Sequence, residues 1–237
     1  MSEIIEQQQG ALTKEISREF FRNVYGYMFG ALAISGILAY YCGTQEFYLT
    51  YFTTESGGIS PLFWIVALAP IGLGLVIQMA YQRLSFALLL VLFIAYSALM
   101  GVSLSVIFLQ FSIPTLASTF FVTAGAFGAM AILGYTTKTD LTKMGSILYM
   151  AFIGIFIASI VNAFMDSEMM DFAISIIGVF VFTGLTAYHM QKLKEISQNT
   201  EIDSINRQKI SLIGGLTLYI LFVNLFLTLL RLVGGRD

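Results

Sequence analysis

Seven long apolar runs determine what this chain can fold into. They cover approximately residues 22–42, 61–81, 84–110, 114–134, 145–165, 170–189 and 210–233. A helix of about 20 apolar residues crosses the hydrocarbon core of a bilayer. The gaps between the runs are short, so consecutive helices should be antiparallel neighbours. The sequence predicts an all-α integral membrane protein, with a polar N-terminal tail (residues 1–21) and one seven-helix domain (residues 22–237).

The composition agrees with a membrane protein and excludes several function classes. The chain is 57% hydrophobic and 11% charged, whereas soluble domains carry about 25% charged residues. The net charge is −2 and no basic tract is present, so nucleic acid is not an expected partner. The expected surroundings are the lipid bilayer. One cysteine, Cys42, and one histidine, His189, exclude an internal disulfide and a cysteine or multi-histidine metal site. No nucleophile–base set or cofactor motif is present, so we expect neither an enzyme nor a cofactor.

The basic residues predict the orientation in the membrane. The N-terminal tail and the second, fourth and sixth connections hold ten of the twelve Lys and Arg residues, whereas the first, third and fifth connections hold none. The ten are Lys14, Arg18, Arg22, Arg83, Lys138, Lys143, Lys192, Lys194, Arg207 and Lys209. The other two, Arg231 and Arg236, lie at the end of the seventh run. Because cytoplasmic loops are enriched in Lys and Arg, we predict a cytoplasmic N-terminus and an external C-terminus.

The last apolar run carries a polar stripe at helical spacing. Thr217, Asn224, Thr228 and Arg231 fall near one helix face, with Leu221 in the middle of that face. Such a stripe should face protein or a water-filled cavity rather than lipid. We therefore expect the seventh helix to be central in the bundle. Tyr219, in the same helix, offers a further hydrogen-bonding group.

Small residues and a proline mark expected packing features. Gly26 and Gly30 in the first run, and Gly101 with its flanking serines in the third, have the spacing that lets helix backbones approach closely. Pro70 lies near the middle of the second run and lacks an amide donor, which predicts a kink or local unwinding. Carbonyls freed by a broken helix can line an ion site, although most such kinks are structural.

The acidic residues and the single histidine are the candidates for chemistry. Every Asp and Glu lies outside the centre of the apolar runs, whereas proton relays and cation transporters usually keep a carboxylate inside the membrane. Asp166, Glu168 and Asp171 on the outer side could attract cations to an entrance, or could be an ordinary acidic loop. His189, placed at the end of the sixth run, could sense cytosolic pH or cap a helix.

Three stretches resemble the bacterial branch of the Bax inhibitor-1 family. They are "YSALMGVSLSVIF", "GYTTKTDLTKMGSILYMAFIGIFIASIVNAF", and "FTGLTAYHMQKLK" together with "LTLYILFVNLFLTLLRLVG". The segment from Gly134 to Gly145 is the most specific part. The resemblance implies a seven-helix bundle with a central seventh helix, and a pH-sensitive leak in which Ca²⁺ is the transported ion. It also implies that some bacterial relatives modulate the quality control of membrane proteins.

The chain departs from this family at the proposed pH sensor. Typical members carry one acid at the position of His189 and another at the position of Leu221, and the two form a carboxylate pair. Two carboxylates that share a proton raise one pKa toward neutrality. A histidine and a leucine cannot do so, and protonation of His189 would add a positive charge instead of removing a negative one. The sequence leaves two hypotheses open: a pH-influenced calcium or cation leak, and a non-conducting scaffold that modulates another membrane protein.

Overall fold

The computed structural model describes residues 2–199 and 201–234 and is built from helices. Within these residues, seven helical segments are long and apolar enough to cross a membrane. They are Thr13–Cys42, Pro61–Ala80, Phe86–Gln110, Ile113–Thr136, Thr142–Met165, Glu168–Gln198 and Ser204–Gly234. The predicted all-α membrane class and the predicted number of spans are therefore confirmed.

Several helices extend beyond the apolar runs that predicted them. α1 (Ser2–Cys42) continues into the segment predicted as a tail, and α9 (Ser204–Gly234) begins before residue 210. α8 (Glu168–Gln198) continues past residue 189, so His189 lies inside the helix and does not cap it. Hydropathy marks the part of a helix that crosses the membrane, whereas polar residues with good helix propensity carry the helix further. Arg236 lies outside the described residues.

The chain divides into two compact units, each with three spanning helices and part of α9. Unit 1 is the chain up to Ser112 together with Asn199–Tyr219. In it, α4 (Phe86–Leu104) contacts both α1 and α3 (Pro61–Ala80). The connection between α1 and α3 contains α2 (Gln45–Phe47) and a π-helix, η1 (Tyr48–Phe52), and α5 (Ile107–Gln110) follows α4.

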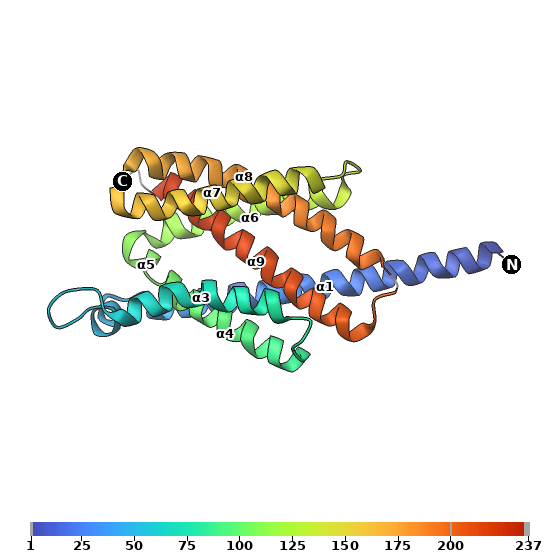
Figure 1. The fold of residues 1–237 in the computed structure, drawn as a ribbon, viewed down its shortest axis with the longest axis horizontal. Coiled ribbons are helices and arrows are strands. Elements are labelled where there is room, and N and C mark those ends of the chain that lie inside the picture. The colour runs from blue at the N-terminus through green and yellow to red at the C-terminus, as the bar shows by residue number, and fades with distance from the viewer. Residues whose placement is uncertain (1, 200, 235–237) are drawn as a thin grey trace. The chain divides into compact units, whose positions relative to one another are not determined.

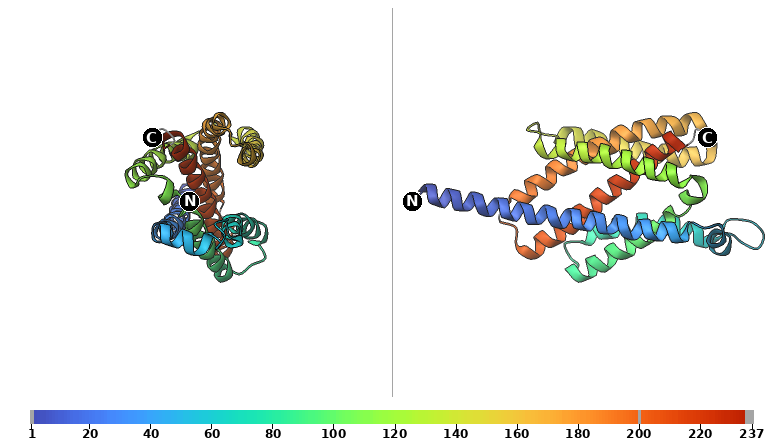
Figure 2. Two further views of the ribbon diagram at one scale, coloured as in Figure 1. Left: turned by 90° about the vertical axis from the view of Figure 1, so that its left-hand side faces the viewer. Right: turned by 180° about the vertical axis from the view of Figure 1, so that it is seen from behind.

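Unit 2 comprises Ile113–Gln198 and the chain from Ile220 onward. In this unit α8 contacts both α6 (Ile113–Thr136) and α7 (Thr142–Met165), and it lies between them (Figures 1 and 2). That the seven helices behave as a single domain remains a prediction.

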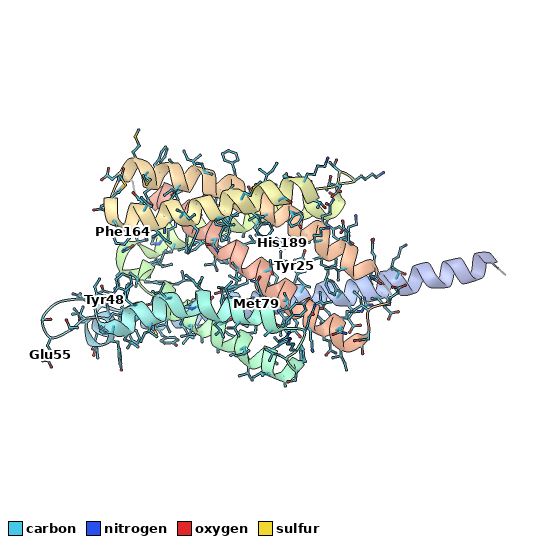
Figure 3. All side chains as sticks on the ribbon, in the orientation of Figure 1. Tyr25, Tyr48, Glu55, Met79, Phe164 and His189 are labelled. Atoms are coloured by element: carbon cyan, nitrogen blue, oxygen red, sulfur yellow. The ribbon has the colours of Figure 1, made fainter. Side chains whose placement is uncertain are left out.

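The exposed surface of the helices is strongly apolar, as expected for contact with lipid. Met79 at the end of α3 and Phe164 at the end of α7, both labelled in Figure 3, are 82% and 86% exposed. None of the apolar window of α7 is buried, whereas 61% of the window of α9 is. Among the described spans α9 therefore has the largest buried share of its apolar window, although its polar stripe is only half-buried.

The predicted close approach of helix backbones occurs at Gly101 but not at Gly26 or Gly30. A Cβ atom on Gly101 would lie 2.6 Å from the carbonyl oxygen of Ser35 in α1, so only glycine fits here. A Cβ atom on Gly26 or Gly30 would meet nothing within 4 Å. The prediction for these two glycines is wrong, because spacing identifies small residues but not the helix face that meets a neighbour.

Pro70 removes a hydrogen bond from α3, and a side chain of α4 replaces it. The helix continues through Pro70 without a break, so the predicted unwinding does not occur. Without an amide hydrogen, Pro70 leaves the carbonyl of Val66, four residues earlier, without its helical donor. The Ser103 hydroxyl donates to that carbonyl over 2.6 Å. An apolar medium requires such a substitute donor, because no water is present to supply one.

Removing the Ser103 hydroxyl should therefore destabilise the protein more when Pro70 is present than when it is replaced. We expect Ser103→Ala to lower the unfolding free energy by about 1 kcal/mol, and to cost less in a Pro70→Ala background, where residue 70 can donate its own N–H. Detergent unfolding of the four proteins in this cycle measures the coupling. Ser118→Ala, an exposed position in α6, is the matched control. Equal costs of Ser103→Ala in both backgrounds would contradict this explanation.

Candidate functional site

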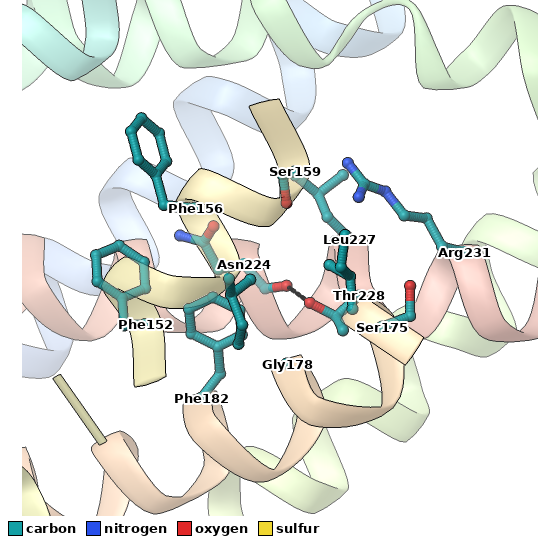
Figure 4. Close-up of a pocket in the computed structure, with 12 residues that line it drawn as sticks. Phe152, Phe156, Ser159, Ser175, Gly178, Phe182, Asn224, Leu227, Thr228 and Arg231 are labelled. Carbon is teal, nitrogen blue, oxygen red and sulfur yellow. Dashed lines mark hydrogen bonds between the residues drawn. The ribbon is translucent and has the colours of Figure 1, made fainter. Parts of the chain in front are cut away.

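Unit 2 contains a cavity of about 110 Å³ between α7, α8 and the C-terminal part of α9 (Figure 4). A cavity of this volume holds several water molecules. Its polar lining consists of Ser159 from α7, Ser175 from α8, and Asn224, Thr228 and Arg231 from α9. Polar groups gathered in a cavity among membrane helices indicate a binding site or a pathway.

The polar stripe of α9 supplies three of these groups. Asn224, Thr228 and Arg231 follow one another at spacings of four and three residues, which places them on one helix face. The Asn224 amide nitrogen donates to the carbonyl of Ile220 over 2.8 Å, and the Thr228 hydroxyl donates to the carbonyl of Asn224 (Figure 4). The predicted stripe thus contributes these three side chains to the lining, whereas Thr217 and Leu221 are not among the described lining residues.

Ser175 of α8 adds a buried hydroxyl without a hydrogen-bond partner. Its side chain is 1% exposed, and its Oγ atom finds no partner among the described residues. Most buried hydroxyls of membrane helices bond to a carbonyl of their own helix. One turn later, a Cβ atom on Gly178 would lie 2.8 Å from the methyl group of Thr228. The glycine therefore lets α8 approach α9 closely beside Ser175.

An ion pair lies at the end of the cavity nearest the C-terminus. Arg231 Nη1 lies 3.5 Å from Asp171 Oδ1, and both side chains are about half exposed. The other two predicted acids are exposed: Asp166 ends α7 in a left-handed conformation (φ 48°), and Glu168 is the first residue of α8. Glu168 and Asp171 also suit the positive end of the α8 dipole. Among the described residues, no three acidic, histidine or cysteine side chains are grouped to hold a metal ion.

Aromatic side chains border the opposite end of the cavity. Phe152 and Phe182 both line it, and their ring centroids lie 5.9 Å apart at 70°. Two turns further along α8, His189 Nε2 lies 2.6 Å from the hydroxyl of Tyr149, which α7 contributes. Ser175, Phe182 and His189 recur every seven residues, so they lie along one face of α8 about 10 Å apart. This face thus presents a polar, an apolar and a second polar group in sequence.

Sequence reasoning found His189 but missed its partner. Tyr149 lies 40 residues away in the chain, and nothing in its surroundings distinguishes it from other tyrosines. His189 is half-buried, and Figure 3 labels its position in α8. Leu221 is 6% exposed and belongs to unit 2. Tyr219 belongs to unit 1, where it is fully buried and contacts Tyr96 edge to face.

The connection between α6 and α7 is held against α8 by side-chain hydrogen bonds. Gln191 accepts from the backbone N–H of Leu141 and donates to the carbonyl of Thr139, each over 2.8 Å. Lys194 donates to the carbonyl of Tyr135 over 2.7 Å. At Gly134, a Cβ atom would overlap the backbone of Ala187, so α6 and α8 touch here. The segment from Gly134 to Leu141 therefore fixes α8 near His189.

Asp140, in the same connection, makes this region sensitive to acid. Hydrogen bonds from Thr142 hold the pKa of the Asp140 carboxyl below its usual value. Because folding lowers this pKa, the carboxylate contributes stability at neutral pH. That contribution is lost as the pH falls through the lowered value.

Replacing Gln191 should loosen the connection. Gln191→Leu leaves the N–H of Leu141 and the carbonyl of Thr139 without partners, and we expect it to lower the unfolding free energy by roughly 2 kcal/mol. Cleavage by protease within residues 137–141 should become faster. Gln198→Leu is the matched control, because Gln198 ends the same helix and is exposed. If both variants lower the unfolding free energy by the same amount, the hydrogen bonds of Gln191 do not hold the connection.

Comparison with known proteins agrees with this architecture. The family described as "Inhibitor of apoptosis-promoting Bax1" matches residues 17–237. The chain is 42% identical over 218 residues to the inner membrane protein YbhL of Escherichia coli K12, covering 92% of each chain. It is 41% identical to an uncharacterized protein of Borreliella burgdorferi, covering 93% of this chain and 94% of that one. An uncharacterized protein of Deinococcus radiodurans is 34% identical over 97% of this chain and 98% of its own length.

Proposed function

Because the chain belongs to the Bax inhibitor-1 family and is a multi-pass protein of the bacterial cytoplasmic membrane, we propose that it is a cation leak whose path lies in unit 2. The observation that carries this proposal is the partly open cavity of unit 2, whose largely apolar lining includes the polar side chains of Asn224, Thr228 and Arg231. Intramembrane polar groups that face a cavity usually mark the route or binding site of an ion. Calcium is the ion that the family resemblance suggests.

The acidic charges around the start of α8 would favour cations over anions near this end of unit 2. Asp166, Glu168 and Asp171 contribute three formal negative charges around the start of α8, and Arg231 contributes one positive charge. Acidic groups at the mouth of a cavity raise the local concentration of cations. With the orientation predicted from Lys and Arg, this mouth faces the outside of the cell.

The contact between Phe152 and Phe182 would close the path in this conformation. Their rings pack edge to face in the lining of the cavity, and Tyr149 and His189 follow on the same two helices, three and seven residues away in sequence. An apolar constriction stops ions because water is excluded from it, and a small separation of its side chains admits water again. A closed leak of this kind needs no charged gate.

His189 would make the leak sensitive to pH in the sense opposite to an acidic pair. The titratable side chains in ring contact with His189 in the described part of the chain are Tyr149 and Tyr188, both neutral near pH 7. Protonation of the imidazole would add a positive charge beside the path, and this charge would repel cations. We therefore propose a leak that decreases as the pH falls.

The aromatic contact gives the first test of the leak. In vesicles reconstituted with the full chain, Phe152→Ala and Phe182→Ala should each increase cation flux severalfold, because they widen the constriction. Phe164→Ala, in the same helix as Phe152 but 86% exposed, should leave the flux unchanged. If no variant and no wild-type preparation conducts Ca²⁺, Na⁺ or K⁺ above empty vesicles, the leak is refuted and the non-conducting scaffold takes its place.

The histidine gives the second test. Flux through the wild-type chain should fall on acidification, because acid protonates an imidazole. His189→Gln keeps a hydrogen-bonding group for Tyr149 but cannot become charged, so its flux should not change with pH. A wild-type flux that rises on acidification, or a variant with the same pH profile as the wild type, would contradict the role of His189.

A further inference from the structure

We propose that the connection between α1 and α3, residues 43–60, binds the membrane surface, with exposed side chains of its π-helix η1 inserted where lipid headgroups meet acyl chains. The proposal concerns unit 1 and does not depend on the leak. Both neighbours of the connection are spanning helices, so the segment begins and ends at one surface of the membrane. Its side chains and its contacts with α3 indicate that it lies on the lipid instead of projecting into water.

Large apolar side chains are exposed together on this connection. Leu49 and Tyr51 of η1, and Ile59 just before α3, are each about half exposed. The last turn of α1 adds the exposed rings of Tyr40 and Tyr41. Tyrosine gathers at the level of the lipid headgroups, because its ring is apolar and its hydroxyl is polar. The apolar, lipid-facing surface of the spans thus continues onto the connection.

Ring contacts hold η1 against the first turn of α3. The ring centroids of the buried Phe52 and of Phe63 lie 5.5 Å apart, edge to face, and Phe63 in turn contacts the ring of Trp64. The Ser60 hydroxyl, which caps the start of α3, also donates to the carbonyl of Tyr51 over 2.8 Å. η1 therefore lies close to the level of Trp64, an exposed side chain at the end of a spanning helix.

Backbone groups of the connection find hydrogen-bond partners within it. The N–H of Ser60 donates to the carbonyl of Phe52 over 2.9 Å, and the Thr53 hydroxyl donates to the carbonyl of Leu49. An irregular segment beside acyl chains needs such internal partners, because little water is present there to replace them. The local structure of η1 thus suits the membrane boundary.

Polar and apolar side chains lie on different sides of this segment. Thr50 precedes the buried Phe52 by two residues, so it points away from α3, and Glu46 lies four residues before Thr50 on the same side. Both are exposed. Leu49 and Tyr51 occupy the flanks between this polar side and the buried one. A polar side with apolar flanks is typical of a segment that lies in the plane of a membrane surface.

The charges of the connection indicate which feature of the membrane it binds. Residues 43–60 include no Lys or Arg, so attraction to anionic headgroups does not contribute. Glu55 is exposed at the tip of the connection, farther from α3 than Tyr48 (Figure 3). The binding therefore depends on apolar contact with the lipid and not on headgroup charge. A second protein is the alternative occupant, and the test below distinguishes it.

The depth of η1 can be measured in the full chain. Trp64 is the one tryptophan and Cys42 the one cysteine in the sequence. In a Cys42→Ser background, Leu49→Cys is labelled with a fluorophore and reconstituted into phosphatidylcholine vesicles that contain lipids with nitroxides at known depths. The same lipids quench Trp64 in the unlabelled protein. We expect the label at residue 49 to lie within one helical turn, about 5 Å, of the depth of Trp64.

The exposed turn at the tip of the connection provides the matched control. Ser56→Cys, labelled in the same way, lies in this turn, and iodide in the water should quench it severalfold more strongly than the label at residue 49. Tyr51→Cys repeats the measurement on the other flank of η1, so the test does not depend on the folding of one variant. Phosphatidylglycerol in the vesicles should not move either η1 label deeper, because the connection has no basic residue.

Two results would overturn the proposal. Iodide quenching at residues 49 and 51 as strong as that at residue 56 would place η1 in water. Protection of both η1 labels from nitroxide lipids and from iodide would mean that a second copy of the chain covers them. Neither result bears on the leak, since flux is not measured here.

Discussion

The need to satisfy every polar group inside an apolar medium governs this structure. Water is absent from the hydrocarbon core, so a backbone carbonyl or a hydroxyl must find its partner in the protein. Pro70 illustrates the rule, because Ser103 of a neighbouring helix supplies the hydrogen that the proline lacks. The buried side chain of Gln191 follows the same rule, because it pairs with both the N–H of Leu141 and the carbonyl of Thr139. The same rule makes the unpartnered hydroxyl of Ser175 significant.

The candidate path follows from the arrangement of side chains on two helices. α8 carries Ser175, Phe182 and His189 on one face, and α7 contributes Phe152 and Tyr149 to the corresponding contacts. Phe152 and Phe182 also line the cavity of unit 2, together with Asn224 and Thr228 (Figure 4). In the proposed leak, the rings would exclude water and the imidazole would respond to pH.

Where the family resemblance leads us to expect two acids, this chain has His189 and Leu221, which changes the expected response to pH. A histidine becomes more positive in acid, whereas a carboxylate becomes less negative. A relative with both acids could therefore share the fold of this chain and differ from it in pH response. Such differences reside in a few side chains, because function depends on the site and the fold only positions it.

The sequence by itself determined the class of the protein, its seven spans and the presence of a polar stripe on α9. These follow from hydropathy and helical period, which are local properties of the chain. Only the tertiary structure decided that Gly101 packs against Ser35 while Gly26 faces open space, that Tyr149 bonds to His189, and that Asn224 and Thr228 line a cavity with residues of α7 and α8. These depend on which helix faces meet and on how far each helix continues past its apolar run. The residue pattern of a single helix does not specify which neighbours it contacts or where it ends, so local patterns could not predict these features.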